Sequence, residues 1–361
     1  MDSESKPIIG ITTGDINGVG IELVVKAFSN SKLNEYCTPV LFGNNKAISF
    51  YAKGVNKDFN FSGCKDLKKL NHKKLNVFNC WQEEVPIKPG KLTPEGGKYA
   101  ARSLEVAVQC LKDKEIDGLL TNPIHKKNIQ GPNFNYTGHT PYLRDSFEQD
   151  DVAMMLCTDY LKVSLLTEHV PITDLERHIN ANAIISKTQI IHKSLIEDFG
   201  IDKPKIAVLA LNPHAGDDGL VGSEEKDIIL PAIEKLNAQN ILAFGPYAAD
   251  GFFARQRYEH FDCVLAMYHD QGLIPFKTLD GGEGVNFTAG LPVVRTSPDH
   301  GTAFDIAGKN LVDESSFLHA LYQCIDVINH RKGYKSNTAN KLQRGLWKKK
   351  MKKSKEDVEQ D

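Results

Sequence analysis

Three strongly apolar runs, each followed within three residues by a histidine, constrain the fold of this chain more than any other feature. They are short and bounded by polar residues, as buried strands are, and comprise residues 163–167, 205–211 and 263–267. Segments with a helical pattern separate them, at about 184–199 and 224–235. Because a helical crossover joins parallel strands, we predict an α/β fold with a parallel sheet.

The histidines that follow these runs are His169, His214 and His269. Parallel strands bring their carboxyl ends to one edge of a sheet, where three imidazoles could bind a divalent transition metal and leave positions open for substrate or water. Their spacing along the chain is too long for a local metal-binding motif, so three separate structural histidines are the alternative. Asp250 and Asp270 could orient a ligand imidazole or transfer a proton.

The segment from Ala266 to Lys309 is dense in chemically active side chains. It contains Lys277, Asn286 and Arg295, two cations and an amide that together suit a phosphate or a carboxylate. Its glycines allow sharp turns and a close approach of the backbone to a ligand. A glycine-rich surface loop with scattered charges is the alternative interpretation.

Two other segments could bind an anion. A first strand at residues 7–13 runs into the glycine-rich turn Gly14–Gly20 and then a helix, an arrangement that presents backbone N–H groups to a phosphate. The turn matches neither the dinucleotide fingerprint nor a P-loop, so a tight strand-to-helix turn is the alternative. His139 lies beside the start of a later helix, where a neutral imidazole could bind an anion or serve as a cap or surface residue.

Composition excludes several classes of protein. The chain has 361 residues, enough for about two domains, and a net charge of −2, which argues against a nucleic-acid or membrane-surface protein. No apolar run approaches the ~20 residues that span a bilayer, and the first residues lack a signal-peptide pattern. The seven cysteines form no CxxC pair. We therefore expect a cytoplasmic protein with reduced thiols.

An open metal site beside anion-binding cations predicts a small phosphorylated substrate with a hydroxyl or carbonyl group, which the metal would polarise. With a nicotinamide acceptor an alcohol could be oxidised to a ketone. Metal-assisted hydrolysis and an aldol-type cleavage remain open at this point. Covalent catalysis is disfavoured, because no nucleophile elbow is present and Cys157 and Cys263 border or lie inside apolar runs.

From about Lys6 to Asn329 the chain resembles the 4-hydroxythreonine-4-phosphate dehydrogenases of pyridoxal phosphate biosynthesis. The most specific matching blocks are YHDQGLIPFK at 268–277 and GVNFTAGLPVVRTSPDHGTAFDIAGK at 284–309. The resemblance implies an isocitrate/isopropylmalate dehydrogenase-like fold, in which two α/β domains flank a cleft. It also implies a homodimer whose active site takes residues from both subunits.

On this basis we expect a discontinuous first domain at 1–135 plus 275–345. A second domain at 136–274 would carry most metal ligands and the dimer contacts, and 346–361 would form a polar tail. The implied reaction is oxidation of 4-phosphooxy-L-threonine by NAD or NADP at the C3 hydroxyl. The product, 2-amino-3-oxo-4-phosphooxybutanoate, then loses CO2 to give 3-amino-2-oxopropyl phosphate.

The resemblance also implies roles for individual residues. It makes His169, His214 and His269 the ligands of zinc, magnesium or cobalt. The implied substrate contacts are His139, Thr140, Lys277, Asn286 and Arg295. We expect Lys277 and Asp250 to act in catalysis, Asp250 by supporting a metal ligand or by proton transfer, with a structural role as its alternative. Which of Lys277 and Arg295 meets the phosphate stays open.

The turn Gly14–Ile21 departs from the family, because Ile16 and Ile21 stand in place of prolines and Asn17 in place of a small residue. This difference leaves room for a sister activity on a four-carbon aldonate 4-phosphate. A phosphate acyltransferase-like enzyme is the alternative from another class, although it would need no metal at the three histidines. A regulatory binding module is disfavoured, because all the implied ligands and contacts are present.

Overall fold

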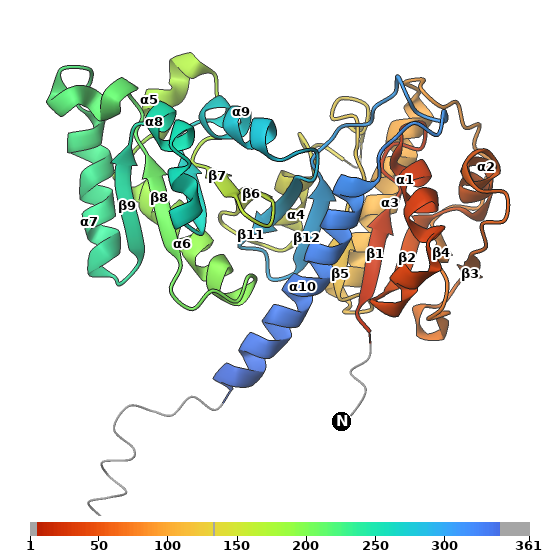
Figure 1. Cartoon of the computed structure of the whole chain (residues 1–361). Helices are drawn as coiled ribbons and strands as arrows, with labels where there is room; N and C mark the ends of the chain where they lie inside the picture. Colours follow the sequence, from red (N-terminus) through yellow and green to blue (C-terminus); the bar gives the residue numbers. More distant parts are fainter. Residues whose placement is uncertain (1–5, 133, 340–361) are drawn as a thin grey trace, which may run out of the picture.

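The centre of the molecule is a mixed sheet, seen in a computed structural model that describes residues 6–132 and 134–339 (Figure 1). Its strands, within these residues, are β1 (Ile8–Thr12), β2 (Thr38–Gly43), β3 (Ser62–Cys64), β4 (Asn76–Asn79), β5 (Gly118–Leu120), β6 (Ala153–Cys157), β7 (Lys162–Leu165), β8 (Lys205–Leu209), β9 (Leu242–Tyr247), β10 (Cys263–Ala266), β11 (Val285–Ala289) and β12 (Val294–Pro298). They lie side by side in the order β3-β4-β2-β1-β5-β12-β11-β6-β7-β10-β8-β9.

Helices pack against the sheet and follow the strands along the chain (Figure 1). They are α1 (Gly20–Phe28), α2 (Asn45–Val55), α3 (Pro94–Lys112), α4 (His139–Ser146), α5 (Leu175–His178), α6 (Ala181–Glu197), α7 (Leu230–Ala238), α8 (Ala249–Ala254), α9 (His269–Leu279) and α10 (Ser315–Thr338). None of the described helices is long and apolar enough to cross a membrane.

The strand pairing confirms the predicted α/β fold. Strands β7, β10 and β8 are hydrogen-bonded neighbours and run parallel, as expected for the strands that precede the three histidines. A second parallel group comprises β3, β4, β2, β1, β5 and β12. Between the groups, β12–β11, β11–β6 and β6–β7 are antiparallel pairs. Three reversals make the two parallel groups run in opposite directions.

The sheet is continuous across the two predicted domains. β11 belongs to the segment 275–345, yet it pairs with β6 of the segment 136–274. The division at 1–135 plus 275–345 and 136–274 therefore stays a prediction. The predicted polar tail, 346–361, lies outside the described residues.

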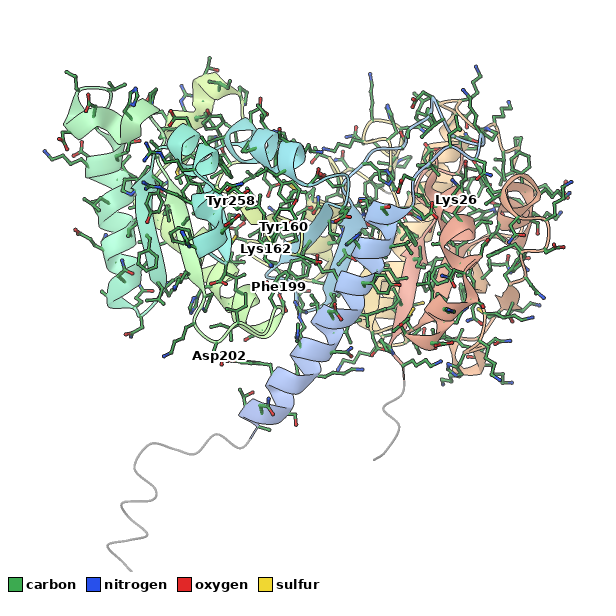
Figure 2. The ribbon with its side chains drawn as sticks, in the orientation of Figure 1. Lys26, Tyr160, Lys162, Phe199, Asp202 and Tyr258 are labelled. Carbon is green, nitrogen blue, oxygen red and sulfur yellow. The ribbon has the colours of Figure 1, made fainter. Side chains whose placement is uncertain are left out.

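Side chains such as Lys26, Tyr160 and Lys162, which Figure 2 labels, make contacts that hold helices and loops in place beside the sheet. Lys26 on α1 donates a hydrogen bond to the carbonyl oxygen of Val312 at 2.6 Å and so anchors the segment before α10. In the other part, the Lys162 ammonium lies 5.1 Å from the centre of the Phe199 ring. The Tyr160 hydroxyl donates to the carbonyl of Leu279 at the end of α9.

The segment 266–309 is not a glycine-rich surface loop. It forms helix α9, which begins at His269 and contains Pro275, followed by the hairpin of β11 and β12. Gly290 follows β11 with φ +89°, a conformation that glycine adopts at low cost. The side chains that drew attention in the sequence therefore lie on regular elements, which hold them in fixed positions.

Candidate active site

A cleft of about 530 Å³ lies where α4, β6, β11 and β12 meet the segment that follows β7. Five of the nine predicted site residues line it, which are His139, Thr140, His169, Asn286 and Arg295. They come from segments that are far apart in the sequence. Folding therefore brings together most of the predicted substrate contacts and one predicted metal ligand.

Arg295 is the most unusual group in this cleft, because its cation is 2% exposed and its hydrogen-bond partners among the described residues are all neutral. Its Nε and Nη2 donate to the Thr121 hydroxyl at 3.0 and 2.8 Å, and its Nη1 donates to the Thr288 hydroxyl at 3.1 Å. A longer contact of 3.4 Å reaches Asn286 Oδ1. Burial lowers the pKa of the guanidinium to about 10, so it remains charged at neutral pH. A buried cation without a counter-charge is a strong site for an anion.

His139 supplies a neutral donor or acceptor beside this cation. It is the first residue of α4, and its Nε2 is enclosed without a hydrogen-bond partner among the described residues. Burial, followed by the charges of Arg295 and Lys126, holds its pKa well below the usual value. The imidazole is therefore neutral at physiological pH and has a free nitrogen for a ligand.

Two of the predicted metal ligands lie together. The rings of His169 and His269 have their centres 6.1 Å apart. Lys126 Nζ donates to His169 Nε2 at 3.2 Å, and His269 Nδ1 donates to Asp270 Oδ1 at 2.7 Å. No hydrogen bond joins His269 Nε2 to another of the described residues. Burial, then Lys126 and His269, lowers the pKa of His169. A neutral imidazole is the form that binds a metal, and the lowered pKa of His169 favours that form, so this residue suits a metal ligand.

His214 does not join this pair within one chain. The described residues contain no group of three or more His, Cys, Asp or Glu side chains that could hold a metal ion. His214 is exposed and lies in a short 3₁₀ turn, Pro213–Gly219, whose residues 214–218 all have positive φ. This left-handed conformation costs roughly 1–2 kcal/mol for each residue other than glycine. Such strain is often found at functional positions.

The two predicted catalytic residues lie outside the residues that line the cleft. Lys277 is exposed on α9 and forms an ion pair with Asp299 at 3.0 Å. Asp250 is exposed in the first turn of α8, just after β9. Because β9 neighbours β8, Asp250 and His214 follow adjacent parallel strands. The catalytic roles of Lys277 and Asp250 therefore stay predictions.

Sequence reasoning missed several residues of the cleft. Lys126 belongs to the polar run 121–127 after β5, which the sequence marks as a plausible ligand loop without assigning Lys126 a role. Lys187 left no signal, because it lies within the helical pattern of α6. It is 8% exposed, and its Nζ donates to Asp151 Oδ1 at 2.9 Å and to the Val152 carbonyl at 2.6 Å. Glu168 also lines the cleft, and burial raises its pKa.

The glycine-rich turn Gly14–Gly20 is a tight strand-to-helix turn rather than a phosphate cradle. The N–H groups of Asp15, Asn17, Gly18 and Val19 all donate within the protein. Gly14 packs so closely that a Cβ there would lie 2.3 Å from the Pro123 carbonyl oxygen. This turn therefore has no free N–H groups at these positions for the phosphates of a cofactor.

A mixed α/β sheet beside a cleft that contains a buried cation and the imidazoles of His139 and His169 is typical of an enzyme that acts on a small anionic substrate. The sequence profile of the family described as "Pyridoxal phosphate biosynthetic protein PdxA" matches residues 35–324. The chain belongs to this family, which confirms the resemblance seen in its motifs.

Relatives and solved structures agree with this assignment. A 4-hydroxythreonine-4-phosphate dehydrogenase of Bacteroides thetaiotaomicron is 45% identical over 96% of this chain and 95% of its own length. A D-threonate 4-phosphate dehydrogenase of Cupriavidus necator is 36% identical over 91% and 99%. The crystal structure of a 4-hydroxythreonine-4-phosphate dehydrogenase from Burkholderia phymatum superposes with a TM-score of 0.76 at 36% identity, covering 90% of this chain and 99% of that one. The superposition confirms the predicted fold. Because the relatives are dehydrogenases, a nicotinamide cofactor is implied.

Proposed function

We propose that the chain oxidises the C3 hydroxyl of 4-phosphooxy-L-threonine with NAD or NADP. The hydride leaves C3 for the nicotinamide and the hydroxyl proton is released, giving 2-amino-3-oxo-4-phosphooxybutanoate. Loss of CO2 then gives 3-amino-2-oxopropyl phosphate. The observation that carries this proposal is the buried, uncompensated Arg295 beside paired imidazoles, in a chain whose relatives are dehydrogenases of such substrates.

Arg295 binds one anionic end of the substrate in this proposal, and Asn286 and Thr140 line the same cleft. The neutral His139 hydrogen-bonds the substrate through its free nitrogen. Lys277 lies in the last turn of α9, shortly before β11. From there it would reach the other anionic end of the substrate. Oriented binding of this kind lowers the barrier by fixing the reacting atoms before the hydride moves.

His169 and His269 would hold a divalent zinc, magnesium or cobalt ion together with His214. A metal bound there polarises the substrate hydroxyl and lowers its pKa. Because His214 does not meet the other two within one chain, we propose that it reaches the cleft of a second copy. Asp250, on the adjacent strand end, would approach with it and support a ligand or accept a proton.

The surface around His214 supports a homodimer with shared sites. Leu220 is 82% exposed and Val221 is 38% exposed, directly after the turn that carries His214. Exposed apolar side chains of this kind mark surfaces that another protein covers. The predicted second domain, 136–274, would then supply the dimer contacts. The buried free thiols of all seven cysteines support the cytoplasm as the location.

The first experiment measures NADH and NADPH formation from 4-phosphooxy-L-threonine by the metal-loaded protein, beside His214→Ala. We expect metal-dependent turnover that the substitution reduces by at least a hundredfold. Absence of turnover by the wild-type protein with zinc, magnesium and cobalt would contradict the proposed substrate.

A second candidate substrate is D-threonate 4-phosphate, on which the Cupriavidus necator relative acts by its name. The observation that favours it is the 36% identity to this relative over 91% of the chain. Ile16 and Ile21 of the altered turn are buried and are not among the residues that line the cleft. The two substrates differ at C2, where 4-phosphooxy-L-threonine has an amino group and D-threonate 4-phosphate has a hydroxyl group. The ratio of their kcat/KM values decides between them, and we expect 4-phosphooxy-L-threonine to be preferred.

A further inference from the structure

We propose that Glu225 is the positioning residue that holds the left-handed turn in the conformation that presents His214. This inference rests on the proposed function, in which His214 is a metal ligand. Glu225 does not touch the substrate or the metal in this proposal. It acts through the backbone of the segment that connects β8 to the turn.

The carboxylate of Glu225 accepts both backbone hydrogen bonds of this segment, while the side-chain amide of Asn212 also donates to Glu224 Oε2 at 2.7 Å. Its Oε1 accepts the N–H groups of Leu211 and Asn212 at 2.8 and 2.7 Å. Its Oε2 accepts from the side-chain amide of Asn212 at 3.0 Å. These contacts fix the two residues at which the chain leaves the sheet and enters the turn.

The turn itself also packs on this carboxylate. A Cβ at Gly216 would lie 2.6 Å from Glu225 Oε2, so the backbone at the middle of the turn touches the same oxygen. The turn is closed by hydrogen bonds from Val221 N–H to the Gly216 carbonyl and from Leu220 N–H to the Asp217 carbonyl, both 3.0 Å. A strained backbone conformation persists only where surrounding contacts hold it, and in this proposal the contacts with Glu225 hold the turn.

Glu225 can do this because its own position is rigid. It is 5% exposed and begins a π-helical turn, Glu225–Ile229, that continues into α7. Ile229, at the end of that turn, is wholly buried in the core. Single π-turns are frequent at functional sites, where they redirect one side chain. The core thus fixes Glu225, and Glu225 fixes the turn.

A carboxylate is better suited to this place than an amide. Both of its oxygens accept hydrogen bonds, whereas glutamine would turn an N–H group toward the Asn212 amide or toward the backbone N–H groups. The Glu225→Gln variant therefore keeps the shape and loses part of the network. The Glu225→Ala variant loses all three hydrogen bonds to Glu225 and leaves two backbone N–H groups without their acceptor.

The experiment uses the full chain as wild type, Glu225→Ala, Glu225→Gln and the control Leu236→Ala. Leu236 is wholly buried on α7, so its truncation destabilises the same helix without removing a hydrogen bond to the turn. Amide hydrogen exchange of residues 211–219 is measured without metal. The affinity for Co²⁺ is measured by absorption titration, and the unfolding temperature is recorded for all four proteins.

We expect Glu225→Ala to speed exchange at Leu211 and Asn212 at least tenfold and to weaken Co²⁺ binding at least tenfold. Glu225→Gln should change both by at least threefold with little loss of unfolding temperature, and it decides the matter if the alanine variant does not fold. Leu236→Ala should lower the unfolding temperature and leave both readouts within twofold of wild type.

Wild-type exchange at 211–219 in Glu225→Gln would overturn the inference, as would equal changes in the Leu236→Ala control. Faster exchange with unchanged Co²⁺ affinity would also overturn it, because the turn would then not present a ligand. A wild-type protein that binds no Co²⁺ would instead contradict the metal site of the proposed function, and the exchange data would still report on the turn.

Discussion

At the scale of single residues, Arg295 is a buried cation whose hydrogen-bond partners among the described residues are neutral, and this arrangement serves binding rather than stability. For Arg295→Met we expect kcat/KM to fall at least a hundredfold, because the anion loses its buried cation. The unfolding temperature should stay the same or rise, since an apolar side chain replaces a desolvated charge. Steady-state kinetics and thermal unfolding check both parts, with Arg295→Lys as the charge-retaining control. A large drop in unfolding temperature with near-normal kinetics would make Arg295 a structural residue.

His139 makes the stability of the fold depend on pH. Its pKa in the folded chain lies well below the ordinary histidine value of 6.5, so the unfolded chain takes up the proton first as the pH falls. The contribution of the neutral His139 side chain to the unfolding free energy is therefore lost as the pH drops below about 6.5. Between pH 7.5 and 5.5 we expect wild type to lose about 1 kcal/mol more unfolding free energy than His139→Gln. Chemical denaturation at the two pH values measures this difference, and equal losses would contradict it.

The sequence predicted those cleft residues that have a reactive side chain and also stand in a polar segment or at the start of a helix. It missed residues that lack one of these two features. Arg295 and Asn286 were found because a dense polar segment contained them, and His139 because it stood at a helix start. Lys187 could not be predicted, because a lysine in a helical pattern is ordinarily exposed and only the fold places it against Asp151. The neutral partners of Arg295, such as Thr121 and Thr288, depend on strand pairing that no local pattern specifies.

At the scale of elements, the close approach of α3 to the segment after β5 determines which glycines can change. A Cβ at Gly97 in α3 would lie 1.9 Å from the carbonyl oxygen of Asn128, whereas a Cβ at Gly54 in α2 would meet nothing within 4 Å. We expect Gly97→Ala to destabilise by about 3 kcal/mol through overpacking. Gly54→Ala should stabilise by about 0.5–1 kcal/mol, because alanine favours a helix. Urea unfolding of both variants tests the pair, and a stable Gly97→Ala would show that the segment moves away.

Elements with a clear apolar period were predicted well, and those governed by special backbone geometry were not. The apolar runs 163–167 and 263–267 form β7 and β10, and the helical pattern at 184–199 forms α6. Helix α9 escaped prediction because Gly272 and Pro275 interrupt its pattern. The left-handed turn at His214 also escaped, since it depends on contacts with Glu225 that lie outside the turn.

At the scale of the whole molecule, the proposal that His214 completes the site of a second copy can be tested with hybrid dimers. His169 and Arg295 line one cleft in the same chain, whereas His214 would act in the other cleft. A hybrid of a His169→Ala subunit with a His214→Ala subunit should therefore have one intact site of two, with about half of the wild-type activity. Co-expression with two different affinity tags provides the hybrids, and NADH or NADPH formation measures their activity.

The matched control combines His169→Ala with Arg295→Met, which damage the same cleft of each subunit and should leave the hybrid inactive. A hybrid of Arg295→Met with His214→Ala should instead regain about half of the activity, because one cleft then keeps its arginine and receives an intact His214. If both hybrids that contain His214→Ala stay inactive while wild type turns over, His214 acts within its own chain. The turn would then have to move toward His169 and His269 when a metal binds, and no second copy would be needed to complete the site.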